Sequence, residues 1–280
     1  MNLIGDIHGE WQLYFNMLKR RVHGPSIQLG DHGFGFKNDA TYCDKKLRRL
    51  GHWFFRGNHD SPEECRQQAN YLGDAGFRSP AFFVSGGFSI DKATRKPGIS
   101  WWEEEELTEV QRRAVVELYR EVKPEIVLSH DAPTTAAQAV LRPFLVPRSD
   151  QYGSWQDRGY YEDKMKGVGT GVISKMLQEM LEIHAPRLWY FAHFHTTRVF
   201  TLEASYQTRF TVLGINDVIQ VPFEFESEDS ITVDSKGILH GPTLADYRHA
   251  LESQRDDNEG IPPGGSPAEI NPPLADPGQA

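Results

Sequence analysis

Several short apolar runs in this chain end abruptly and are followed by loops of glycine, acids, histidines or asparagine. The runs stand at residues 1–4, 26–29, 52–55, 126–128 and 188–191, and the loops after them read GDIHG, GDHG, RGNHD, SHD and AHFH. Runs of this kind are typical of buried strands. Because the carboxyl ends of parallel strands meet at one edge of a sheet, the loops that leave them converge on a shared crevice. The sequence therefore predicts one site built from five distant segments.

Amphipathic segments separate these runs and set the fold class. Apolar residues recur at helical spacing over 11–22, 107–122 and 172–183. Residues 81–84 form another strand-like run. Alternating polar and apolar residues predict antiparallel strands near 197–202, 208–213 and 218–225. This order of elements predicts an α/β layered sandwich rather than a barrel of eight repeats.

The composition excludes several classes of protein. A chain of 280 residues with 39% apolar side chains can bury a substantial core, and two cysteines are too few for a disulfide framework. A net charge of -9 disfavours general binding to nucleic acid, which depends on neutralisation of phosphates by lysine and arginine. The first residues lack the basic head and apolar run of a signal peptide, and no apolar stretch is long enough to cross a membrane. We expect a cytoplasmic location with no membrane partner.

The composition changes near Ser253. From there on, aspartate, asparagine, glycine and proline dominate, with almost nothing to bury. Such a segment buries too little apolar surface to offset the conformational entropy that ordering its chain would cost. We therefore predict a single catalytic domain over residues 1–252 and a disordered tail over residues 253–280.

The loops after the apolar runs carry side chains that can ligate a metal or move a proton. Each loop taken alone has another explanation, since an aspartate can cap a helix and a histidine can lie in solvent. His193 and His195, two apart on a strand, would place both rings on one face, which suits a metal. Repetition at five strand ends makes the joint pattern specific. The candidates are Asp6, His8, Asp31, Asn58, His59, His130, His193 and His195.

These loops, in this order, resemble the five motifs of the calcineurin-like metallophosphoesterases over roughly the first two hundred residues, most closely the stand-alone enzymes of bacteria and their viruses. The resemblance implies a four-layer α/β/β/α sandwich that holds two metal ions. Asp31 would bridge the two ions. The first ion would be held by Asp6, His8, Asp31 and His195, and the second by Asp31, Asn58, His130 and His193.

The mixed imidazole and oxygen donors suit transition metals better than calcium. We expect manganese, with iron, zinc, nickel or magnesium as alternatives. The resemblance further implies hydrolysis of phosphate mono- or diesters by a hydroxide that bridges the metals, with His59 as the acid that protonates the leaving group. For Asp60 two roles stay open: it orients His59, or it caps the helix that starts near Ser61.

The chain departs from the protein Ser/Thr phosphatase branch, which continues its second motif with a carboxylate and an arginine. Phe34, Gly35 and Phe36 stand there instead. This favours a small, nucleotide-like phosphoester as substrate over a phosphoprotein, with a phosphoprotein phosphatase and a non-catalytic scaffold as alternatives. The phosphate-binding role must pass to another residue, for which the candidates are His32, Arg56 and Arg158. In the fifth motif, Ala192 and Phe194 replace a glycine and a small hydroxyl residue.

Overall fold

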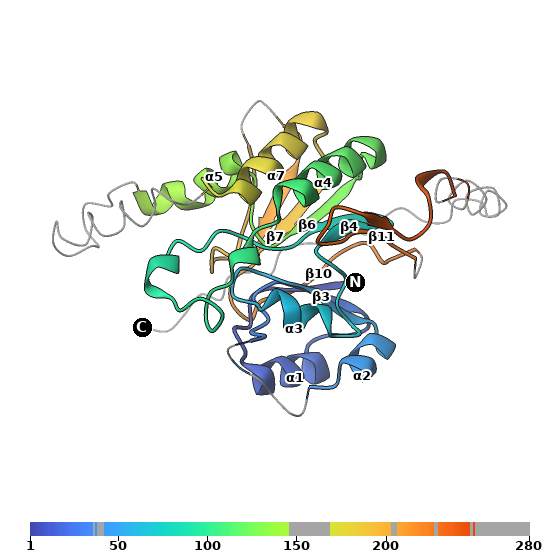
Figure 1. Ribbon diagram of the computed structural model, residues 1–280. Helices are drawn as coiled ribbons and strands as arrows, with labels where there is room; N and C mark the ends of the chain where they lie inside the picture. Colours follow the sequence, from blue (N-terminus) through green and yellow to red (C-terminus); the bar gives the residue numbers. More distant parts are fainter. Residues whose placement is uncertain are drawn as a thin grey trace, which may run out of the picture. The chain divides into compact units, whose positions relative to one another are not determined.

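Two stacked β-sheets with helices on their outer faces make up the computed structural model of this chain (Figure 1). The structure describes residues 1–35, 37, 42–145, 169–202, 206–226, 229–246 and 249. The chain divides into one unit over Met1–Pro242 and a second over Thr243–Ala280. The predicted tail over residues 253–280 and the predicted domain end at residue 252 lie outside the described residues. The first unit contains both sheets and every candidate site residue.

The smaller sheet holds the first three predicted strands side by side. Its order is β10 (Val218–Gln220), β1 (Asn2–Ile4), β2 (Ser26–Leu29) and β3 (His52–Phe55). The strands β1, β2 and β3 are parallel, and β10 runs antiparallel to β1. The loops that follow β1, β2 and β3 therefore leave from the same edge.

The larger sheet has eight strands. Its order is β12 (Leu239–His240), β11 (Ile231–Val233), β4 (Ala75–Arg78), β5 (Ala81–Val84), β6 (Ile126–Ser129), β7 (Leu188–Phe191), β9 (Arg209–Val212) and β8 (Arg198–Thr201). The strands β5, β6, β7 and β9 are parallel, and the outer pairings are antiparallel. The expectation of antiparallel strands late in the chain holds for β10 with β1 and for β8 with β9, but β9 also pairs in parallel with β7.

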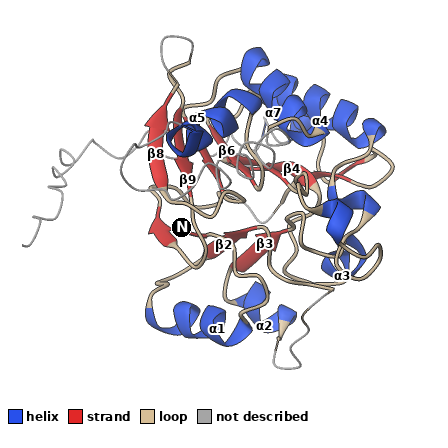
Figure 2. Cartoon of the chain, turned by 90° about the vertical axis from the view of Figure 1, so that its left-hand side faces the viewer, coloured by secondary structure: helices blue, strands red, loops and turns tan. Residues whose placement is uncertain are grey.

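Helices cover the outer face of each sheet. In the views of Figures 1 and 2, α1 and α2 lie outside the smaller sheet, and α4 and α7 lie outside the larger one. These layers confirm the four-layer α/β/β/α sandwich. The helices are α1 (Trp11–Arg20), α2 (Asp44–Arg49), α3 (Pro62–Arg66), α4 (Glu109–Val122), α5 (Thr134–Leu145) and α7 (Val172–Ile183), with short 3-10 helices η1 (Lys92–Thr94) and η2 (Glu103–Glu105). No helix in the described part of the chain is long and apolar enough to cross a membrane.

Alternation along the strands separates two cores. Leu29 and Phe55 of the smaller sheet meet Phe83 and Leu128 of the larger sheet in the layer between them. The next residue along a strand points the other way, so Phe54 packs with α1 in a second cluster. This inner packing fixes both sheets against each other and so brings their strand ends together.

Two helices, α3 and α4, begin at residues with a side-chain cap. The α4 helix begins at Glu109, two residues later than predicted, because Thr108 forms a capping box with Gln111. For α3 the cap is Ser61, whose side chain accepts a hydrogen bond from the Glu64 amide. Asp60 therefore does not cap this helix.

We expect Phe83→Ala to lower the free energy of unfolding by about 3–5 kcal/mol, because the buried ring leaves a cavity between the two sheets. Ile99→Ala, at a side chain that is 60% exposed, is the control and should change it by no more than about 0.5 kcal/mol. Urea denaturation of the two variants measures both values. Similar losses in the two would contradict the assignment of the inter-sheet core.

Candidate metal centre

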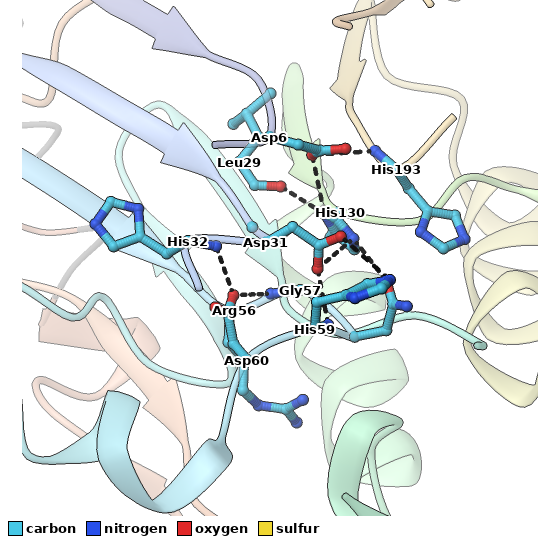
Figure 3. A network of polar contacts seen from close by, with 12 residues as sticks. Asp6, Leu29, Asp31, His32, Arg56, Gly57, His59, Asp60, His130 and His193 are labelled. Carbon is cyan, nitrogen blue, oxygen red and sulfur yellow. Dashed lines mark hydrogen bonds and ion pairs between the residues drawn. The ribbon is translucent and has the colours of Figure 1, made fainter. Parts of the chain in front are cut away.

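Five loops from two sheets meet at one place in the structure (Figure 3). Asp6, Asp31 and His59 follow β1, β2 and β3 of the smaller sheet, whereas His130 and His193 follow β6 and β7 of the larger sheet. Because the two sheets are stacked, candidate metal ligands approach the site from two sides, which the edge of a single sheet would not allow.

The first cluster contains Asp6, His8, Asp31 and His195, each of which offers one ligand atom within 4.8 Å of the others. The Nε2 atoms of His8 and His195 lie 3.0 Å apart, and Nε2 of His195 lies 3.4 Å from Oδ2 of Asp6. The two aspartates are buried, while His8 and His195 are partly open to solvent. Two imidazoles and two carboxylates thus face one small volume.

The second cluster contains Asp31, His130 and His193. Nε2 of His130 lies 3.3 Å from Oδ1 of Asp31 and 3.0 Å from Oδ1 of Asn58, so Asn58 joins this cluster. Nδ1 of His130 donates to the carbonyl of Leu29 at 2.8 Å, which leaves Nε2 as the ligand atom. Asp31 belongs to both clusters.

The donor groups fit a cation. Oδ2 of Asp6 and Oδ2 of Asp31 are both buried, and neither has a hydrogen-bond partner among the described residues. Burial raises the pKa of the Asp6 carboxyl well above its ordinary value, which shows how unfavourable its charge is without a positive partner. Buried carboxylate oxygens with no partner are costly unless they coordinate a metal or pair with a charge.

Backbone strain is concentrated at the same residues. His8, Asp31, His193 and His195 have φ values of +45°, +55°, +69° and +51°. Only two other non-glycine residues in the described part of the chain, Lys123 and Asn216, have a positive φ. Each such conformation costs about 1–3 kcal/mol, and strain of this kind gathers at functional sites.

The expectation for His193 and His195 was wrong in its geometry. Both follow the end of β7 instead of lying on a strand, and their left-handed conformations send them to different clusters. The turn forms without a glycine at 192, since the Phe194 amide donates to the Ala192 carbonyl at 2.8 Å. Strand alternation does not apply to a loop in which both histidines have positive φ.

His59 lies at the edge of the clusters. Its backbone amide donates to Oδ1 of Asp31 at 2.8 Å, and its Nε2 lies 3.9 Å from Oδ2 of Asp31. Burial lowers the pKa of His59, Arg95 adds to the lowering, and Asp31 opposes it. The side chain is still 24% exposed, so a substrate can reach it.

Asp60 has a role that neither sequence interpretation anticipates. Its Oδ2 accepts from the amides of His32 and Gly57, and its Oδ1 accepts from those of Gly33 and Phe34. These bonds tie the loop after β2 to the loop after β3 (Figure 3). Both oxygens of the Asp60 carboxylate accept hydrogen bonds from backbone amides. Asp60 therefore affects His59 only through the conformation of this loop.

Two candidates for phosphate binding are structural. The His32 ring is buried and stacked on Phe54 with centroids 4.7 Å apart, and burial lowers its pKa to about 3. Arg56 is 1% exposed and pairs with Asp74 at 2.8 Å. Arg158 lies outside the described residues.

The segment between β5 and α4 supplies three residues that the sequence motifs do not mark. Nδ2 of Asn58 donates to Oγ of Ser89 at 2.9 Å, and this hydroxyl donates to the buried carboxylate of Glu105. These bonds fix the Asn58 amide so that Oδ1 faces His130. Nη2 of Arg95 lies 2.6 Å from Nε2 of His59. The sequence signal was confined to an i,i+4 Asp91–Arg95 pair, which is too common to single out.

We expect Gly57→Ala to lose bound metal and stability. A Cβ there would lie 2.1 Å from Oδ1 of Asp31 and 2.7 Å from Nε2 of His130, so both ligands would have to move. Gly24→Ala is the control, because nothing lies within 4 Å and only its φ of +86° makes it strained. It should cost about 1–2 kcal/mol and keep its metal. Full metal content in Gly57→Ala, measured by elemental analysis, would argue against this geometry.

Metal binding should release close to one proton at neutral pH. Burial alone would lower the pKa of His130, but the carboxylates of Asp31 and Asp6 outweigh it and raise that pKa to about 10. The imidazolium must lose its proton before Nε2 can ligate, so metal affinity should increase as the pH rises towards 10. Titration calorimetry in buffers of different ionisation enthalpy measures the release. An apparent binding enthalpy that is the same in all buffers would rule it out.

Comparisons with known proteins agree with this site. A family model described as calcineurin-like phosphoesterase matches residues 2–197, which include all the candidate ligands. No protein of curated function matches the chain.

Three solved structures share low sequence identity with the chain. A putative 5'-nucleotidase from Staphylococcus aureus is 11% identical, with a TM-score of 0.36 over 91% of this chain and 57% of that one. GAP50, the anchor in the inner membrane complex of Plasmodium, is 10% identical, with a TM-score of 0.38 over 86% and 88%. A 5'-nucleotidase precursor from Thermus thermophilus is 12% identical, with a TM-score of 0.32 over 92% and 54%. The chain thus spans little more than half the length of the two nucleotidases.

The family match covers well over half of the chain and includes every residue of the two clusters. The chain therefore belongs to the calcineurin-like phosphoesterase family.

Proposed function

We propose that this chain hydrolyses small phosphoesters with two metal ions, most readily manganese. The first would be held by Asp6, His8, Asp31 and His195, and the second by Asp31, Asn58, His130 and His193. The observation that carries the proposal is the buried Asp31 carboxylate, which belongs to two imidazole-rich clusters and has one oxygen without a hydrogen-bond partner among the described residues. A carboxylate has two oxygens and can serve two cations at once.

The chemistry of such a pair of ions is general. When bound, two divalent ions about 3.5–4 Å apart lower the pKa of a water and neutralise the oxygens of a phosphoryl group. The chain itself supplies their placement. Asp31 sets the spacing, the Leu29 carbonyl fixes the His130 tautomer, and Ser89 fixes the Asn58 amide.

We assign His59 as the acid that protonates the leaving group. It contacts Asp31 through its backbone amide, which holds its ring beside the clusters without making it a ligand of either. A phosphoryl group over Asp31 would place its leaving oxygen within reach of this imidazole. His59 then donates a proton to that oxygen as the bond to phosphorus breaks.

A small substrate is favoured over a phosphoprotein. The branch that acts on proteins has a carboxylate and an arginine where this chain has Phe34 and Gly35. Phe34 is 5% exposed and packs with Trp11 and Phe54, so that position belongs to the core. A nucleotide-like phosphoester remains our preferred substrate class, and both mono- and diesters are compatible with the two clusters.

Metal removal tests the proposal. The protein loaded with manganese should hydrolyse 4-nitrophenyl phosphate, and chelation should abolish turnover and lower the melting temperature, because a ligand bound only by the folded state stabilises it. Asp31→Asn should remove nearly all activity and most of the stabilisation by manganese, whereas Glu117→Gln on the exposed face of α4 should behave as wild type. Asp31→Asn with activity close to wild type would exclude a shared ligand, and a melting temperature unchanged by chelation would exclude a bound metal.

A second experiment tests His59. An alkyl phosphate needs a proton on its leaving oxygen, while nitrophenolate leaves readily without one. His59→Asn should therefore lose about 100- to 10,000-fold in rate on the alkyl ester and far less on 4-nitrophenyl phosphate. His23→Asn, at an exposed histidine, is the control.

The metal content of His59→Asn separates the alternatives. Equal losses on both esters with full metal would assign His59 to phosphate binding. Loss of metal would make His59 a ligand.

A further inference from the structure

Arg95 presents a guanidinium directly beside His59. Its Nη2 lies 2.6 Å from Nε2 of His59, and that Nε2 lies 3.9 Å from Oδ2 of Asp31. One phosphoryl group over Asp31 is therefore within reach of the arginine. The side chain is 12% exposed and lies in the segment between β5 and α4, just after η1.

The guanidinium is held in place before any substrate binds. Nε donates to Oδ1 of Asp91 at 2.8 Å and Nη2 to Oδ2 at 2.9 Å, a two-point contact that fixes the plane of the group. Nη1 donates to the carbonyl of Ser100 at 3.1 Å. Arginine keeps its charge at any physiological pH. The side chain therefore offers a fixed positive charge at a fixed position.

One N–H group of Arg95 is available to a substrate, and a second becomes available when the contact with His59 opens. A guanidinium has five N–H donors, of which Asp91 takes two, Ser100 one and His59 one. The last N–H of Nη1 has no hydrogen-bond partner among the described residues. Because arginine only donates, Nε2 of His59 must accept in this arrangement. If the same nitrogen carries the proton for the leaving group, the contact with Arg95 opens and frees a second N–H.

Other cations near the site, whether buried or exposed, have carboxylate partners. Arg56 and Arg66 both pair with Asp74. At the loop after β1, Lys37 pairs with Glu10 at 2.6 Å. Arg95 also has a carboxylate partner, but its two-point contact leaves the remaining edge of the guanidinium turned to His59.

The charge of the substrate determines which phosphoester the free edge of the Arg95 guanidinium would bind. Near neutral pH a phosphomonoester carries about 1.5 to 2 negative charges over three non-bridging oxygens, because its second pKa is about 6. A phosphodiester has one charge over two such oxygens. Two metal ions can each take one oxygen in either case. The third oxygen of the monoester, with its extra charge, needs a further cation.

We propose that Arg95 binds the third non-bridging oxygen of a phosphomonoester and so makes this chain selective for terminal phosphates over phosphodiesters. The proposal rests on the proposed function, since the two ions define the other two oxygens. Asp91 is a positioning residue, because it orients the guanidinium and touches no substrate atom.

The test compares 4-nitrophenyl phosphate with bis(4-nitrophenyl) phosphate. Both release the same nitrophenolate, so the role of His59 cancels. For the manganese-loaded wild type we expect kcat/KM to be higher on the monoester. Arg95→Gln should lower kcat/KM on the monoester about 10- to 100-fold, the loss typical of a charged hydrogen bond, and change that on the diester less than about 3-fold. Arg95→Lys, which keeps the charge, should recover part of the loss.

Lys96→Gln provides a matched control. It removes the same charge at the next residue along the chain, from an exposed side chain. It should leave both substrates unaffected. Metal content should be equal in all four proteins, which excludes an indirect effect through the clusters.

A binding measurement is independent of turnover. Titration calorimetry of manganese-loaded protein with inorganic phosphate should give an affinity about 10- to 100-fold weaker in Arg95→Gln than in wild type. Equal losses on mono- and diester, no loss on either, or a wild type that prefers the diester would overturn the assignment of Arg95. A wild type that binds phosphate through Arg95 but hydrolyses neither ester would instead overturn the proposed function, and a wild type that does not bind phosphate would overturn both.

Discussion

The buried carboxylate of Asp31 is the group on which the rest of the site depends. It takes part in both candidate clusters, accepts the His59 amide and lies 3.3 Å from Nε2 of His130. Burial raises the pKa of Asp31, but the charge of His130 and its hydrogen bond to Asp31 outweigh burial and hold that pKa well below its ordinary value. Its charge is therefore kept in a place where an isolated carboxylate would be neutral.

Several features of the surrounding fold hold the Asp31 carboxylate in its buried position. Gly57 leaves the space that its oxygen occupies, and the positive φ of Asp31 turns the chain sharply after β2. The four amides bound by Asp60 hold the next loop against it. Strain at the candidate ligands is tolerated because two sheets, packed through a common apolar layer, fix the strand ends from which the loops begin.

Much of this could be predicted from the sequence, and the exceptions share a cause. The bounds of β2, β3, β5, β7 and α7 agree with the predictions, because apolar runs punctuated by glycine and proline are local signals. His193 and His195 were placed on a strand because a sequence does not show φ. Burial excludes His32 and Arg56 from contact with a phosphate, and Asp60 binds backbone amides instead of capping α3. The contacts that decide this, such as Arg56 with Asp74 and Asp60 with the His32 amide, join residues far apart in the sequence.

Arg95 and Ser89 could not be found from the sequence for the same reason. Each matters through a contact with a residue more than thirty positions earlier, Arg95 with His59 and Ser89 with Asn58. Glu105, which accepts from Ser89, belongs to the same connection between β5 and α4.

One connection therefore supports two adjacent residues of the third motif by separate means: a neutral amide contact at Asn58 and a charged contact at His59. A change at Arg95 leaves the path from Glu105 through Ser89 to Asn58 intact, since the two paths share no side chain. The loops at the strand ends thus determine where cations can bind, while the β5–α4 connection can alter the surroundings of His59 without disturbing them.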